Sequence, residues 1–260
     1  MKRLAALLAL AAACAAGQAA DYVKLPGGRF ESVLPQGATP TASAPVDIAP
    51  FLMRTTPVTA AEYAGFVATH PQWQRGRTAS VLADVRYLAK WASPLQPGAA
   101  VPASSPVTDV SWFAAGAFCE AEGGRLPSWL EWEYAAAADA TRTDARSDPA
   151  WQRQILAWYE QPSAPTLPAV GGPPNAYGVR DLHGAIWEWV DDFNALFIAG
   201  DSRTQGDPDK LKFCGAGALN IIDRDSYAVL MRIALLSSLN GADTTANLGF
   251  RCVRDLERTP

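Results

Sequence analysis

Four stretches of the chain place apolar residues at helical spacing. They cover about residues 60–69, 111–122, 128–139 and 150–159. Two of them begin with a capping-box pattern, Thr59 with Glu62 and Ser128 with Glu131. The second stretch is closed by a pair of glycines, which suits a helix stop. We therefore expect four short helices.

Strand signals are shorter and lie toward the two ends of the chain. They fall at residues 22–34, as two strands around a Pro-Gly-Gly turn, and at residues 187–190, 211–213 and 249–253. Stretches rich in proline and small residues interrupt the regular elements at about residues 35–46, 94–106 and 160–175. Short helices and strands joined by long loops predict an α+β fold with much irregular structure.

The N-terminus differs in character from the rest of the chain. Lys2 and Arg3 precede an apolar run over residues 4–16, and small residues follow, which is the pattern of a secretory signal peptide. The run is too short to span a bilayer comfortably as a permanent helix. We expect a signal peptide over residues 1–20 and a periplasmic mature chain. The alternatives are a membrane anchor, a buried helix, or lipoprotein processing at Cys14, where the preceding alanines match a lipoprotein signal poorly.

The composition of the 260-residue chain is that of a globular protein, with 49% hydrophobic and 18% charged residues. The net charge is -4, and acidic and basic residues are scattered along the chain. This distribution lacks the basic footprint of a nucleic-acid-binding protein and the basic amphipathic stretch of a membrane-surface protein. We expect residues 21–260 to form a single domain that binds no nucleic acid and does not span a membrane.

Four segments stand out in order along the chain. They are MRTTPVTAAEYAGFV (residues 53–67), VTDVSWFAAGAFCEAEGGRLPSWLEWEYAA (107–136), NAYGVRDLHGAIWEWVDD (175–192) and NLGFRCVR (247–254). Together they resemble the formylglycine-generating enzyme superfamily, which includes the sulfatase-modifying factors, over nearly all of the mature chain. The resemblance implies a C-type-lectin-like α+β fold with little regular structure.

The same resemblance points to a missing catalytic feature. Active enzymes of this family hold copper(I) with two cysteines and so activate oxygen, and soft thiolates suit this ion. The matching segment here begins at Cys214, and residues 215–251 contain no cysteine. Asn220, Asp223 and Asp225 occupy the neighbourhood of the missing pair. We therefore expect no formylglycine-generating activity and assign no catalytic residue.

Three cysteines remain after the predicted signal peptide. In the family, cysteines at the places of Cys119 and Cys252 form a disulfide, so we expect that bridge here. Two buried free thiols are the alternative. Cys214 is then left without a disulfide partner. Three interpretations stay open for it: a copper ligand together with a methionine such as Met231, a redox-active thiol, or a buried strand residue.

A metal site is also implied by the resemblance. Asp181, Gly184, Ile186 and Glu188 match a calcium site of the family. There the first and last residues give side-chain oxygens and the middle two give backbone carbonyls, the hard ligands that calcium requires. In the alternative reading, Asp181 closes a turn and Glu188 pairs with an arginine. Calcium is thus the expected cofactor, and copper depends on Cys214.

The remaining charged and titratable candidates read as structural. His70 and His183 have no second histidine at zinc-ligand spacing, so we expect them at loop or surface positions. The charged residues of the family motifs are expected to pair within the framework. These residues are Arg125, Glu131, Glu133 and Arg251.

The function expected from these observations is that of an exported accessory or binding protein, one that assists the maturation or regulation of another envelope protein. Within the superfamily, the FCGAGAL segment and the run from DLHG to DFN are similar to accessory proteins of copper nitrite reductases, which implies a link to denitrification. Fold alone does not fix function. The alternatives are an oxidative maturation enzyme for a peptide or small molecule, and a copper carrier that uses Cys214.

Overall fold

The computed structural model describes residues 20–34, 45–160, 166–196 and 227–256. The predicted signal peptide with Cys14, the predicted strand at 211–213, Cys214 and the neighbourhood of the missing cysteine pair lie outside the described residues, apart from Ala20. Within the described ranges, no helix has the length and apolar character needed to cross a membrane.

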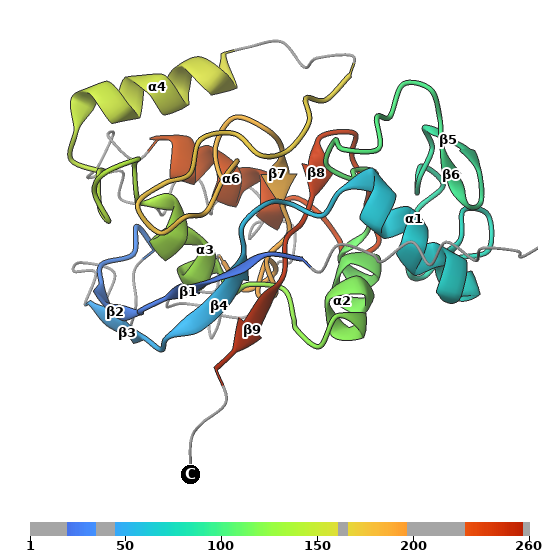
Figure 1. Cartoon of the computed structure of the whole chain (residues 1–260), viewed down its shortest axis with the longest axis horizontal. Coiled ribbons are helices and arrows are strands. Elements are labelled where there is room, and N and C mark those ends of the chain that lie inside the picture. Colours follow the sequence, from blue (N-terminus) through green and yellow to red (C-terminus); the bar gives the residue numbers. More distant parts are fainter. Residues whose placement is uncertain (1–19, 35–44, 161–165, 197–226, 257–260) are drawn as a thin grey trace, which may run out of the picture.

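A three-stranded antiparallel sheet joins the two ends of the described chain (Figure 1). Its strands are β1 (Tyr22–Leu25), β4 (Phe51–Arg54) and β9 (Val253–Asp255), in the order β1-β4-β9. Met53 in the central strand lies opposite Val23 on one side and Val253 on the other, and its side chain is fully buried. Residues of the last motif therefore complete the sheet that the first residues begin.

Three further strand pairs surround this sheet. They are β2 (Gly28–Phe30) with β3 (Val46–Ile48), β5 (Trp91–Ser93) with β6 (Gln96–Pro97), and β7 (Trp187–Glu188) with β8 (Leu248–Gly249). The β7–β8 pair is parallel, whereas the other two are antiparallel. Because β7 and β8 come from different motifs, their pairing brings Glu188 close to Arg251.

The regular helices confirm the four that were predicted and add one. They are α1 (Ala60–Thr69), α2 (Trp112–Ala121), α3 (Trp129–Ala136), α4 (Pro149–Tyr159) and α6 (Tyr227–Ser237), with a 3-10 turn η1 (Pro71–Trp73). Both predicted capping boxes form, at Thr59 with Glu62 and at Ser128 with Glu131. Figure 1 shows α3, α4 and α6 on the left of the molecule, and α1, α2 and the β5–β6 pair on the right.

Helix α3 ends earlier than the sequence predicted, at Ala136 rather than near residue 139. The carboxylate of Asp139 accepts hydrogen bonds from the backbone N–H groups of Thr141 at 2.8 Å and Arg142 at 2.6 Å. Such a local side-chain turn competes with the helical hydrogen bonds that would continue the element. The helix therefore ends within the run of alanines, just before the turn that Asp139 closes.

The disulfide implied by the family resemblance is present. Cys119 of α2 is bonded to Cys252 with an S–S distance of 2.03 Å and a Cα–Cα distance of 5.4 Å. Beside it, the ring of Phe118 packs against Phe250 at 5.4 Å and against Tyr63 at 5.8 Å between centroids. The bridge thus joins α2 to the final motif inside an aromatic core.

Candidate functional site

A buried ion pair between β7 and the final motif lies where the sequence motifs meet. Arg251 donates from Nη2 to Oε1 of Glu188 at 2.7 Å and from Nε to Oε2 at 2.8 Å. The indole Nε1 of Trp132 donates to the same Oε2 at 2.9 Å. Both charged side chains have 0% exposed surface. Glu188 therefore pairs with an arginine, as the alternative reading of the sequence proposed.

A second arginine lies behind this pair. Arg232 of α6 places its guanidinium 3.5 Å from the ring centroid of Trp132 and donates to the backbone carbonyl of Glu188. Its Nε is buried and has no hydrogen-bond partner in the part of the chain that the structure describes. Burial lowers the pKa of Arg232 to about 10, which still leaves it charged at neutral pH. The buried carboxylate of Glu188 thus has two cations near it.

Asp181, at the start of the same loop, closes a turn. Its backbone is left-handed, with φ at 59°, and its carboxylate accepts from the backbone N–H of Gly171 at 2.7 Å and of Gly172 at 3.0 Å. Gly184 also has a positive φ, of 97°, where a side chain would be strained. The aspartate therefore fastens the 171–172 segment to the loop that leads into β7.

This arrangement is poorly suited to calcium. Calcium needs six to eight oxygen ligands, and both carboxylates of the predicted site already accept hydrogen bonds from protein donors. A divalent ion at Glu188 would also lie beside the buried cations Arg251 and Arg232. No group of three or more histidine, cysteine or acidic side chains gathers as a metal site within the described ranges. The calcium site stays a prediction, and the charges around Glu188 argue against it.

His183 lies in a loop, as the sequence predicted, but its ring is turned inward and the residue is only partly exposed. Its ring lies between the indoles of Trp132 at 5.8 Å and Trp151 at 5.6 Å, and its Nε2 contacts the carbonyl oxygen of Ala136 at 2.9 Å. Because the partner is a carbonyl, Nε2 carries the proton and Nδ1 is left as an acceptor. Burial lowers the pKa of His183 to about 4, so the ring is neutral at physiological pH. The loop that holds it folds inward against α3 and α4.

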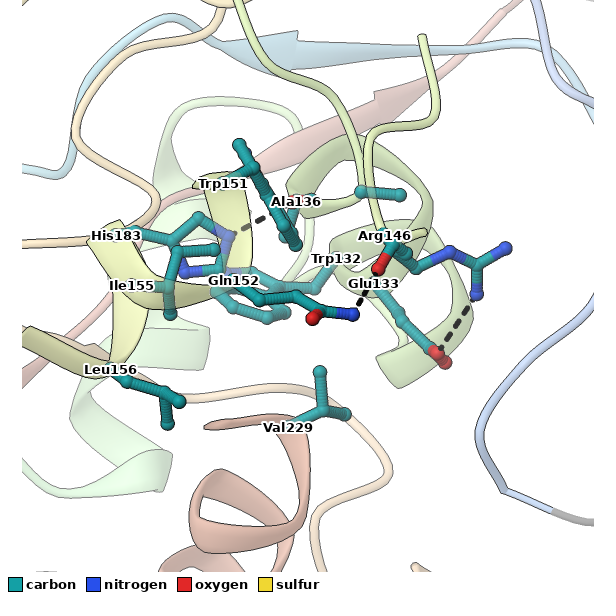
Figure 2. Close-up of a pocket in the computed structure, with 11 residues that line it drawn as sticks. Trp132, Glu133, Ala136, Arg146, Trp151, Gln152, Ile155, Leu156, His183 and Val229 are labelled. Carbon is teal, nitrogen blue, oxygen red and sulfur yellow. Dashed lines mark hydrogen bonds and ion pairs between the residues drawn. The ribbon is translucent and has the colours of Figure 1, made fainter. Parts of the chain in front are cut away.

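Beside His183 is a small cavity between α3, α4 and α6 (Figure 2). Its volume is about 30 Å³, room for about one or two water molecules. Figure 2 shows Leu156 and Val229 on one side of the space, and the amide of Gln152 reaching across it to the backbone of Arg146. Val229 belongs to the first turns of α6, directly after the stretch where the family resemblance places the copper-binding cysteines.

A much larger groove lies on the other side of α4. It has a volume of about 710 Å³ and shares Trp151, Ile155 and His183 with the cavity. One face of α4 lines it, and the loops at residues 138–142 and 173–184 form its other walls. The groove therefore contains Asp181 and Gly184 of the predicted metal loop, whereas Glu188 does not line it.

The structure brings together only some of the residues singled out in the sequence. Glu188 and Arg251 meet, Asp181 lies on the groove, and Cys214 lies outside the described residues. Sequence reasoning missed Arg232 and the groove face of α4. The spacing of Trp151, Gln154, Ile155 and Trp158 contained that signal, since these positions form one helical stripe.

The fold and the motifs define a family. The chain matches the sulfatase-modifying factor enzyme 1-like domain over residues 9–256 and belongs to this family. The formylglycine-generating enzyme of Streptomyces coelicolor is 29% identical, over 91% of this chain and 90% of that enzyme. The inactive C-alpha-formylglycine-generating enzyme 2 of Bos taurus is 25% identical, over 94% of this chain and 91% of that protein.

Solved structures agree on the fold. The crystal structure of CarF superposes with a TM-score of 0.51 at 18% sequence identity, covering 92% of this chain and 99% of CarF. At this identity the likeness concerns the fold alone. The predicted formylglycine-generating-enzyme fold, with helices and small sheets, is therefore confirmed.

Proposed function

We propose that this chain is a partner-binding member of the family that acts in the cell envelope and makes no formylglycine. The observation that carries the proposal is the absence of any cysteine between residues 215 and 251. Without two thiolates in that stretch, the chain lacks the soft ligands that hold cuprous copper in the active relatives. The export part of the proposal rests on the basic and apolar pattern of residues 1–20.

Two buried carboxylates, Glu133 in the wall of the cavity and Glu188 bonded to the wall residue Trp132, favour binding rather than catalysis. A general base needs a lone pair free to reach a substrate proton. Glu188 accepts from Arg251 and Trp132, and Glu133 accepts from Ser32, Trp129 and the backbone N–H of Val33. These two side chains are thus committed to structure.

A relative gives the proposal a precedent. The protein of Bos taurus that matches 94% of this chain is named an inactive formylglycine-generating enzyme, so the family includes members that lack the reaction. A chain that keeps the fold but lacks the thiolates retains its surfaces for recognition. The partner we propose is another envelope protein, whose maturation or regulation the chain assists.

The catalytic part of the proposal is tested with the purified mature chain, Cu(I), oxygen and a sulfatase-type cysteine peptide. The product aldehyde is measured by mass spectrometry and by hydrazide capture. We expect no aldehyde, while the Streptomyces coelicolor enzyme converts the same peptide in a parallel reaction. Conversion by this chain above the copper-only background would refute the proposal.

The binding part is tested by photo-crosslinking in the periplasm. A photoreactive amino acid is placed at Gln154, on the groove face of α4, and in a matched strain at Arg29, which is exposed on β2. We expect an envelope protein to be joined from Gln154 and not from Arg29, and the purified partner to bind the purified chain. Copper nitrite reductase is the first candidate for reconstitution, because of the resemblance of the FCGAGAL segment. Equal crosslinking from both positions would contradict a specific site.

A further inference from the structure

The groove beside α4 has a regular pattern of side chains. Trp151, Gln154, Ile155 and Trp158 lie at i, i+3, i+4 and i+7, so one stripe of the helix faces the groove. Apolar stripes of surface helices normally face a core, but the indoles of Trp151 and Trp158 are only partly buried. Figure 1 shows α4 at the edge of the molecule, above α3 and α6. The stripe is therefore available to a ligand in the groove.

Acidic side chains line the groove together with the two tryptophans. Asp148 caps the N-terminus of α4, three residues before Trp151, and accepts from the backbone N–H of Ala150 at 2.7 Å. At the other end, Trp158 Cδ1 lies 3.8 Å from the point that a Cβ would occupy on Gly184, three residues after Asp181. Asp148 thus lies on the same helix as Trp151, and the loop that holds Asp181 approaches Trp158 at Gly184.

The charges that line the groove favour a cation. Among the described residues, three carboxylates line it, Asp139, Asp148 and Asp181, against one cation, Arg142. Arg142 bonds Asp139 and Asp148 and neutralises one of these two charges. The described lining therefore combines a net negative charge with two indoles, the two features that attract ammonium and guanidinium groups.

The two ends are separated by a distance that an extended peptide matches. Trp151 and Trp158 are seven residues apart in α4, about 10 Å at 1.5 Å per residue. In an extended chain of the polyproline II type, which has three residues per turn and a rise of about 3.1 Å per residue, residues three positions apart lie on the same side and about 9 Å apart. Side chains at that spacing on a peptide in the groove can each reach one indole.

We propose that this groove binds an extended segment of the partner protein through two basic side chains three positions apart, one at Trp151 with Asp148 and one at Trp158 with Asp181. The identity of the occupant as a partner segment rests on the proposed function. Arginine suits both positions because its planar guanidinium stacks on an indole while its N–H groups bond a carboxylate.

The test uses three blocked hexapeptides and the purified mature chain. The probes are Ac-ARAARA-amide, its isomer Ac-ARRAAA-amide with the same charge, and the neutral Ac-AQAAQA-amide. We expect the first peptide to bind about tenfold more tightly than either of the others, by calorimetry. Its affinity should fall as salt is added, because partly exposed charges are screened.

Variants locate the binding. Asp148→Asn removes the charge but keeps a residue that caps helices well, so it should weaken the first peptide severalfold without loss of the fold. Trp151→Leu should weaken it by about tenfold. Ala157→Ser, at an exposed position of the same helix, is the matched control and should bind as the unaltered chain does. A thermal unfolding curve for each variant separates lost binding from lost structure.

Several results would overturn the proposal. If the two charged isomers bound equally, the proposed spacing of three positions would be wrong. If the neutral peptide bound as tightly as the first peptide, the groove would not recognise cationic side chains. Free arginine binding as tightly as the peptide would make the groove a small-molecule site. The proposed function fails separately, through aldehyde formation or nonspecific crosslinking, since those measurements do not involve these peptides.

Discussion

The guanidinium of Arg251 lies 2.7 Å from the carboxylate of Glu188, and neither side chain has any exposed surface. The pair joins β7 to the residues just after β8, and Trp132 of α3 donates to the same carboxylate. Three motifs that are far apart in the sequence therefore meet at one buried charge. Removing either partner leaves the other as a buried charge that has lost its ion-pair partner, which is the costly case for a buried pair.

We predict that Glu188→Gln and Arg251→Met each lower the free energy of unfolding by about 3–5 kcal/mol. The double variant should lose less than the sum of the two, because the interaction between Glu188 and Arg251 is removed only once. Urea unfolding followed by tryptophan fluorescence measures all three. Asp255→Asn, in the exposed pair with Arg125, is the control and should change stability by less than about 1 kcal/mol. Strict additivity of the two single losses would contradict the coupling.

The disulfide should stabilise the fold strongly, because 133 residues separate Cys119 and Cys252. Replacing both cysteines with alanine should lower the free energy of unfolding by about 3–5 kcal/mol in the chain-entropy description. Dithiothreitol should shift the midpoint of the unaltered protein toward that of the variant. The variant itself should not respond to the reductant, and a response there would assign the effect to Cys214 instead.

Calcium should leave the thermal stability unchanged. The carboxylate of Glu188 is paired with Arg251, and Arg232 is a second buried cation nearby. Both arginines would repel an incoming divalent cation. We expect the melting temperature to be the same in calcium, magnesium and EDTA. A ligand that binds the folded state at 100 times its Kd would add about 2.7 kcal/mol. A rise in melting temperature specific to calcium, lost in Asp181→Asn, would establish the family's metal site here.

Acid should destabilise the protein through His183. Its pKa falls from 6.5 to about 4 on folding because the ring is buried, so the unfolded chain takes up the proton more readily. The stability that depends on the neutral His183 ring is fully present above pH 6.5. It is lost as the pH falls from there toward 4, by an amount on the order of 3 kcal/mol. We expect the slope of stability against pH in this window to be smaller in His183→Gln. His70→Gln, which removes the other histidine, should keep the slope of the unaltered chain.

Local signals explain which helices the sequence predicted. The capping boxes at Thr59 and Ser128 are contained within four residues, so α1 and α3 could be placed from sequence alone. Helix α6 has no capping-box pair in its sequence, since Val229 stands three residues after Ser226, and its sequence YAVLMRIALLS is apolar on most sides. Helical periodicity cannot be seen in such a run. The strands β3 and β4 were missed because elements of three or four residues depend on their partners more than on their own sequence.

The candidate site was predictable only in part, for a related reason. Family motifs identified Glu188 and Arg251 without showing that they pair, since their contact depends on the parallel alignment of β7 with β8. The inward position of His183 depends on α4, which packs its Trp151 against the ring. No pattern within the loop itself encodes that burial. By contrast, the stripe of α4 that faces the groove follows from the spacing of its own residues, so it is predictable from the sequence.

The order β1-β4-β9 has a consequence for the making of the protein. The strand that closes the sheet is β9, so the sheet cannot be complete until residues 253–255 have been synthesised. A nascent chain that stops before residue 251 has neither Arg251 nor Cys252, and β4 is left with an open edge. Shortened products should be degraded rather than accumulate as partly folded species.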